Sequence, residues 1–123
     1  MKTTDKIALL RRAVQWLYED DPETFVGGCG DVCDVLRLLA EDLGLDGVCM
    51  TGGTTPQTGW HAWLTIDGER YDPIADVLGK KWGPYEEDPS VLVMVCGGVY
   101  DEDDVACLRQ VVDPQPPKRR RRS

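Results

Sequence analysis

The chain has 123 residues and a formal net charge of −8, which is enough for one domain with a modest buried core. No apolar run approaches the roughly 18 residues that a membrane span needs. Residues 1–5 lack the apolar stretch of a signal peptide. We therefore expect a soluble, cytoplasmic protein with no membrane partner.

The charge is distributed unevenly along the chain. Five of the fourteen basic residues lie in segment 118–122, so the preceding residues hold nine basic against 22 acidic side chains, a balance of −13. With this negative charge, residues 1–117 are expected to repel nucleic-acid phosphates and to favour a basic substrate segment. Segment 114–123 is expected to form a disordered basic tail, rich in Pro and Arg. That tail is the one part of the chain expected to be able to bind nucleic acid or an acidic partner.

The cysteines do not predict a cross-linked or metal-bound fold. Their number is odd, no C-x-x-C occurs, and His61 is the single imidazole, so neither a disulfide framework nor a structural zinc site is expected. We expect most of the thiols to be small buried hydrophobic residues in a reducing compartment, and we expect no cofactor. The five are Cys29, Cys33, Cys49, Cys96 and Cys107.

Hydrophobic periodicity predicts two helices near the N-terminus. Residues 4–19 give an amphipathic pattern that Pro22 ends, and a loop follows. A second helix is expected from Cys29 to a C-terminal cap at Gly44, with Asp31 in its first turn, where an acid suits the helix dipole.

The rest of the chain predicts mainly strands. Two helices followed by strands close in sequence indicate an α+β fold, with the N-terminal helices packed on an antiparallel sheet in one domain over 1–113. Residues 74–90 carry few periodic signals. The expected elements are a strand over 47–51, a flexible loop over 52–59, hairpin strands over 60–66 and 69–73, a buried strand over 91–96 and a helix over 101–110.

The hairpin places His61 and Asp72 on one face. Its turn, Asp67-Gly68, fixes a register in which Trp63 pairs with Asp72 and His61 becomes the diagonal neighbour of Asp72. Such neighbours have Cβ atoms about 7 Å apart, so the carboxylate can reach the imidazole. It would then fix the tautomer and leave the other ring nitrogen free to act as a base. The alternative is a polar pair with no role beyond structure.

Cys29 stands at the start of the second predicted helix, after Gly27-Gly28. Thiolates are stabilised at helix N-termini and by a nearby imidazolium, and the glycines allow a substrate to approach closely. The N–H of Cys29 is free at a helix start and can donate to an oxyanion. Cys33, one turn further on, is expected to be buried packing. The alternative for Cys29 is an ordinary buried cysteine at a tight turn.

Three segments in this order share the motifs of a known family, a G-x-C-x-D-x-A pattern with an apolar helix, then H-A-W, then a turn with Gly before D-P. The matching residues are Gly27-Gly28-Cys29-Gly30-Asp31-Val32-Cys33, then Leu36, Leu39 and Leu43-Gly44, then His61-Ala62-Trp63, Asp67-Gly68 and Asp72-Pro73. Over residues 27–77 the chain resembles the transglutaminase-like cysteine hydrolases of the papain-like superfamily. Cys33 replaces the small residue that is usual there.

The resemblance implies a small papain- or transglutaminase-like core and a catalytic triad. Cys29 would be the nucleophile, His61 the base and Asp72 the residue that orients it. The implied activity is thiol-dependent acyl transfer on a peptide or protein substrate, by a peptidase, isopeptidase or deamidase with water as acceptor, or by a transamidase with an amine. Gly28, Trp60 and Trp63 are expected at the substrate cleft.

Three alternatives remain open at the level of sequence. The chain could be a catalytically inactive module of the same fold that binds a peptide or protein partner. It could be an interaction protein that acts through its basic tail. Least favoured is a metal site formed by Cys29, His61 and Asp72, whose side chains are possible ligands.

Overall fold

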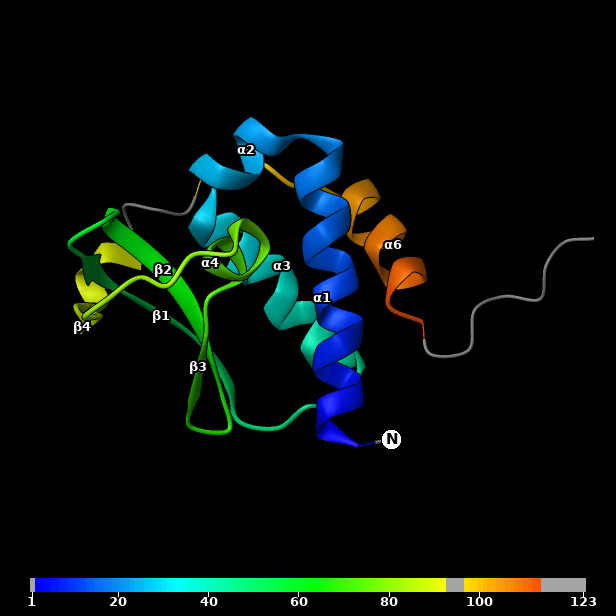
Figure 1. Cartoon of the computed structure of the whole chain (residues 1–123). Coiled ribbons are helices and arrows are strands. Elements are labelled where there is room, and N and C mark those ends of the chain that lie inside the picture. The colour runs from blue at the N-terminus through cyan, green and yellow to red at the C-terminus, as the bar shows by residue number, and fades with distance from the viewer. Residues whose placement is uncertain (1, 93–96, 114–123) are drawn as a thin grey trace, which may run out of the picture.

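Helices gather beside a four-stranded antiparallel sheet with the strand order β3-β2-β1-β4, which is an α+β arrangement (Figure 1). The computed structural model describes residues 2–92 and 97–113. The elements are α1 (Thr3–Asp20), α2 (Pro22–Gly27), α3 (Cys29–Asp42), β1 (Val48–Thr55), β2 (Gly59–Ile66), β3 (Glu69–Tyr71), α4 (Pro73–Leu78), β4 (Glu86–Glu87), the 3-10 helix η1 (Pro89–Val91) and α6 (Glu102–Val111).

The core lies between α3, α1 and the sheet. The predicted stripes are confirmed, because Leu10 and Leu17 of α1 and Leu36 of α3 are at most 1% exposed. Helix α3 packs on β1 and β2, where Ala62 and Leu64 are fully buried. Burying each large aliphatic side chain stabilises the fold by about 1.5–3 kcal/mol. Helix α3 is therefore held firmly in the core, and it positions the thiol of Cys29, its first residue.

The flexible loop expected over 52–59 is largely a strand instead. Strand β1 continues through Gly52 and Gly53 to Thr55 and pairs with β2. A Cβ atom at Gly53 would collide with the Trp63 ring and the β4 backbone, and one at Gly52 would collide with Leu92. Glycine here permits close packing against the strand and not a mobile turn.

Two short helices were not expected, α2 in the predicted loop and α4 where the second hairpin strand was predicted to run to Pro73. Both begin with the same pair of residues. Asp21 caps α2 through the N–H of Thr24, and Asp72 caps α4, with Pro22 and Pro73 at the first helical positions. Asp followed by Pro is a helix-start signal, so the sequence did contain the information for both helices.

The C-terminal predictions have mixed outcomes. The helix expected over 101–110 is confirmed as α6, with a capping box between Asp101 and Asp104. Of the strand expected over 91–96, Val91 belongs to η1, and residues 93–96 lie outside the described residues. The predicted tail over 114–123 also lies outside them. Within the described chain, no helix has the length and apolar character needed to cross a membrane.

The prediction that most thiols are buried holds for two of the four cysteines described. Cys29 and Cys33 are buried, whereas Cys49 on β1 and Cys107 on α6 are exposed. The two exposed thiols provide internal references for the reactivity of Cys29.

Candidate active site

His61 and Asp72 form a buried pair. The predicted register is present, with Leu64 opposite Tyr71. His61 Nε2 lies 2.7 Å from Asp72 Oδ2, and the two residues are 3% and 8% exposed. The predicted contact is confirmed, although Asp72 stands at the start of α4 and not on a strand. Because a carboxylate only accepts, Nε2 carries the proton and donates.

The Asp72 carboxylate is held by further donors. Its Oδ1 accepts from the backbone N–H of Ile74 at 3.1 Å and of Ala75 at 3.2 Å, as the N-cap of α4. Its Oδ2 accepts from the Tyr85 hydroxyl at 2.7 Å, in addition to His61. Donors on both oxygens fix the orientation of the carboxylate and favour its charged form. The imidazole is thereby oriented through Nε2.

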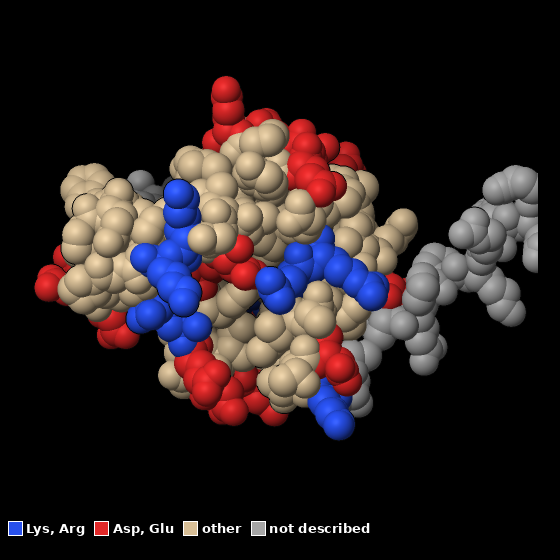
Figure 2. All heavy atoms as spheres, in the orientation of Figure 1, with Lys and Arg blue, Asp and Glu red and all other residues tan. Residues whose placement is uncertain are grey.

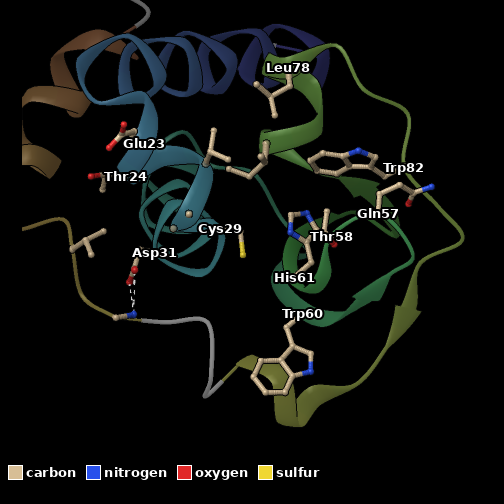
Figure 3. Close-up of a pocket in the computed structure, with 16 residues that line it drawn as sticks. Glu23, Thr24, Cys29, Asp31, Gln57, Thr58, Trp60, His61, Leu78 and Trp82 are labelled. Carbon is tan, nitrogen blue, oxygen red and sulfur yellow. Dashed lines mark hydrogen bonds between the residues drawn. The ribbon is translucent and has the colours of Figure 1, made fainter.

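Cys29 meets this pair from the first position of α3, with Gly28 as N-cap. Its side chain lies beside the ring of His61 in the cleft (Figure 3), and the interaction between the two raises the pKa of His61. Since Nε2 is bound to Asp72, Nδ1 is the ring nitrogen that remains for the thiol. The backbone N–H of Cys29 lies in the first helical turn and has no acceptor within the helix. The structure therefore brings Cys29, His61 and Asp72 together in the order that was expected.

The charge of His61 follows from these neighbours. Burial lowers the pKa of the imidazole, but the hydrogen bonds and charges of Asp72 and Cys29 outweigh burial and raise the pKa from 6.5 to about 9. The imidazolium is therefore stable at neutral pH. A thiolate paired with an imidazolium is the reactive form of a cysteine nucleophile.

Tyr85 was not predicted as part of the site. Besides its hydrogen bond to Asp72, its ring packs edge-on against Trp63 with centroids 4.8 Å apart, and the Arg70 guanidinium lies 3.8 Å above it. Burial, then the hydrogen bond to Asp72, raises the pKa of Tyr85, so the phenol remains a donor. It lies in the segment over 74–90 that carries few periodic signals, and nothing local in the sequence marks it.

Three tryptophans surround the site in different ways. Trp60 is 59% exposed and lines the cleft, as expected. Trp63, also expected at the cleft, is 2% exposed, packs against His61 at 6.2 Å and is not among the lining residues. Trp82, which was not predicted, lines the cleft and packs edge-on against His61 at 5.5 Å. The imidazole thus packs against two indole rings.

A cleft of about 860 Å³ opens over Cys29 and His61. This volume lies within the range of small-ligand sites. Gly28 lines the cleft as expected, together with residues of α2, Trp60 and Trp82. Cys29 is only 8% exposed, so it lies at the floor of the cleft and not on an open surface.

Asp31 builds one wall of the cleft. Its carboxylate accepts from the backbone N–H of Gly97 at 2.9 Å and of Gly98 at 2.6 Å. This contact fixes the segment that carries Val99, which lines the cleft. The sequence placed Asp31 in a helical first turn but gave no sign of a partner 66 positions away.

No group of three or more His, Cys, Asp or Glu side chains in the described residues is arranged to hold a metal ion. The alternative of a metal held by Cys29, His61 and Asp72 therefore gains no support from that part of the chain.

Comparisons of this chain with protein-family models, with curated proteins and with solved structures found no match. The interpretation of the site therefore depends on its residues and their geometry.

Proposed function

We propose that this chain is a small thiol-dependent acyl-transfer enzyme with the triad Cys29, His61 and Asp72, built on a papain- or transglutaminase-like core. The activity that fits best is that of a cysteine peptidase, isopeptidase or deamidase acting on a peptide or protein. One observation carries the proposal: Cys29 lines a cleft beside His61, whose ring interacts with the thiol and whose Nε2 is bound to a buried carboxylate.

The first half of the reaction forms a thioester. Cys29 gives its proton to His61 Nδ1 before the substrate binds, and the resulting thiolate attacks the carbonyl carbon of a carboxamide or peptide bond. The Cys29 N–H donates to the oxyanion that develops. His61 then gives its proton to the departing nitrogen as the C–N bond breaks. Asp72 stays ionised throughout and holds the imidazolium in place.

The second half releases the acyl group. Water attacks the thioester while His61 accepts its proton, and the C–S bond breaks to return the thiolate and the imidazolium. If an amine attacks in place of water, the same residues perform a transamidation. The acceptor is therefore the variable that separates a hydrolase from a transamidase.

The test is capture of the acyl-enzyme. The protein is mixed with short peptide thioesters, quenched in acid and analysed by peptide mass spectrometry. The acyl group should be found on Cys29, and His61→Gln should slow its formation by about 10²–10⁴-fold, the usual contribution of a general base. Cys49→Ala and Cys107→Ala should acylate Cys29 normally, because those thiols lie outside the cleft.

Two results would speak against the proposal. Acyl groups spread equally over Cys29, Cys49 and Cys107 would show no selective nucleophile. Peptides that bind in the cleft without acylating Cys29 would favour the inactive binding module. Among positive results, release of free acid identifies a hydrolase, and transfer to an added primary amine identifies a transamidase.

A further inference from the structure

The cleft collects exposed apolar side chains. Val26, Val99 and Trp60 are the exposed large hydrophobic residues of the described chain, at 46%, 51% and 59%, and all three line the cleft. They come from α2, from the segment before α6 and from β2. Exposed apolar residues that gather at one hollow mark a binding surface. These three side chains form an apolar rim of the cleft around Cys29, which is therefore suited to apolar side chains of a ligand.

The rim lies on both sides of the thiol. In Figure 3, Glu23 of α2 and Trp60 of β2 lie on opposite sides of Cys29. An extended peptide advances about 3.3 Å per residue and directs successive side chains to alternate faces. A segment that crosses Cys29 would therefore contact Trp60 on one side of the reacting carbonyl and α2 on the other.

The α2 side of the cleft is negatively charged. Among the described residues that line the cleft, Glu23 and Asp31 are the charged ones apart from the imidazole, and none is Lys or Arg. Asp31 is occupied by backbone N–H groups, whereas Glu23 is exposed and forms no ion pair within the described residues. Figure 2 shows acidic side chains gathered over the α2 end of the molecule.

The negative potential extends to Tyr100, the residue after Val99. Burial, followed by the charges of Asp21, Asp31 and Asp104, raises the pKa of Tyr100 to about 12. Burial opposes a charge of either sign, whereas the three carboxylates oppose an anion and attract a cation. A ligand cation placed on the α2 side would therefore be favoured, and an anion disfavoured.

We propose that the cleft binds an extended peptide that directs a Lys or Arg side chain toward Glu23 and an apolar side chain onto Trp60, on opposite sides of the reacting carbonyl. Resting on the proposed function, this preference makes basic peptides the substrate class. Val26 and Val99 would cover the aliphatic stem of the basic side chain, because such stems pack on apolar surface while the charged end reaches an acid.

The preference is measured with extended peptides that carry a thiol-reactive epoxide at their centre. Each position on both sides of the epoxide is varied among Lys, norleucine and Glu, and the second-order rate of Cys29 modification is recorded. At one position or more, Lys should react at least ~10-fold faster than Glu, with norleucine between them. About 1 M NaCl, where the Debye length is near 3 Å, should reduce that ratio.

Glu23→Gln should reduce the Lys-to-Glu ratio several-fold. Glu69→Gln removes the same charge from β3, outside the cleft, and should leave the ratio unchanged. Iodoacetamide carries no peptide, so its rate with Cys29 should be equal in the wild-type protein and in Glu69→Gln. If Lys is not preferred at any position, or if Glu23→Gln leaves the ratio intact, the preference for basic peptides is overturned while the proposed function stands.

The proposed function fails separately, if iodoacetamide does not select Cys29 in the wild-type protein. In that case the same peptides without the epoxide are titrated against the protein by calorimetry. Tighter binding of the Lys peptides, weakened by Glu23→Gln, supports the preference in a binding module. Equal affinities for the Lys and Glu peptides overturn it.

Discussion

Tyr85 donates its hydroxyl hydrogen to Asp72 Oδ2, the same oxygen that accepts from His61, and both distances are 2.7 Å. The charge of Asp72 is thereby shared between a phenol and an imidazole. Tyr85 is not among the residues that line the cleft, so we expect it to act on His61 through Asp72, as a positioning residue.

Tyr85→Phe should weaken the fold and change the titration of His61. Loss of a hydrogen bond to a charged group should lower the free energy of unfolding by about 1–3 kcal/mol, measured by urea denaturation. With one donor fewer, Asp72 interacts more strongly with the imidazolium, so the pKa of His61 should rise above that in the wild-type protein. His61 is the only histidine, so its ring protons can be followed by NMR without ambiguity.

Tyr71→Phe is the matched control, because the Tyr71 hydroxyl donates to Asp76 at 3.0 Å and not to Asp72. It should also lose stability but leave the titration of His61 unchanged. If the two variants shift that titration equally, Tyr85 has no specific effect on the site.

Asp72→Asn separates the charge of this residue from its capping role. Asn is also a good N-cap, so α4 should remain folded. The amide lacks the negative charge that opposes burial of the imidazolium, so the pKa of His61 should fall well below 9. NMR titration of His61 measures the change, and circular dichroism checks the fold. A folded variant with an unchanged titration would show that Asp72 does not set the charge of His61.

Gly28 should tolerate no side chain. A Cβ atom there would lie 2.7 Å from the backbone oxygen of Thr24, so α2 and the start of α3 would have to separate. Gly28→Ala should lower the free energy of unfolding by about 1–3 kcal/mol, which is typical of overpacking, and should slow acylation of Cys29. At Gly27 a Cβ atom meets nothing within 4 Å, so Gly27→Ala should change stability by no more than about 0.5 kcal/mol. Equal losses in the two variants would contradict the packing explanation.

Stability should depend on pH through His61. Its pKa is about 6.5 in the unfolded chain and about 9 in the fold, so protonation stabilises the fold fully below pH ~6.5. This contribution is lost as the pH rises through about 9. Between these limits the wild-type protein should lose about 1–3 kcal/mol more than His61→Gln does. Parallel pH profiles for the two proteins would show that the imidazolium is not stabilised.

The sequence predicted the parts of the fold that depend on local pattern. Apolar periodicity predicted α1 and α3, and the Asp67-Gly68 turn predicted a hairpin register that brings His61 to Asp72. Both signals act over a few residues, so neighbours elsewhere in the fold do not override them.

The parts that the sequence did not predict depend on distant partners. Gly52 and Gly53 looked like a loop because the ring and backbone that need their small size lie in other elements. Tyr85 and Asp31 carry no local signal, since the first meets Asp72 across a segment without periodicity and the second meets Gly97 from far along the chain. Such contacts follow from the packing of the whole domain.

The pH dependence of Cys29 alkylation tests the central claim most directly. Iodoacetamide is applied near pH 6, where an ordinary thiol with a pKa of about 8.5 is almost wholly protonated, and the rates at Cys29, Cys49 and Cys107 are measured by mass spectrometry. If His61 stabilises the thiolate, Cys29 should react at least ~10-fold faster than the two exposed thiols, and His61→Gln should abolish the difference. Equal rates at the three cysteines, or a fast reaction at Cys29 that persists in His61→Gln, would contradict a thiol activated by His61.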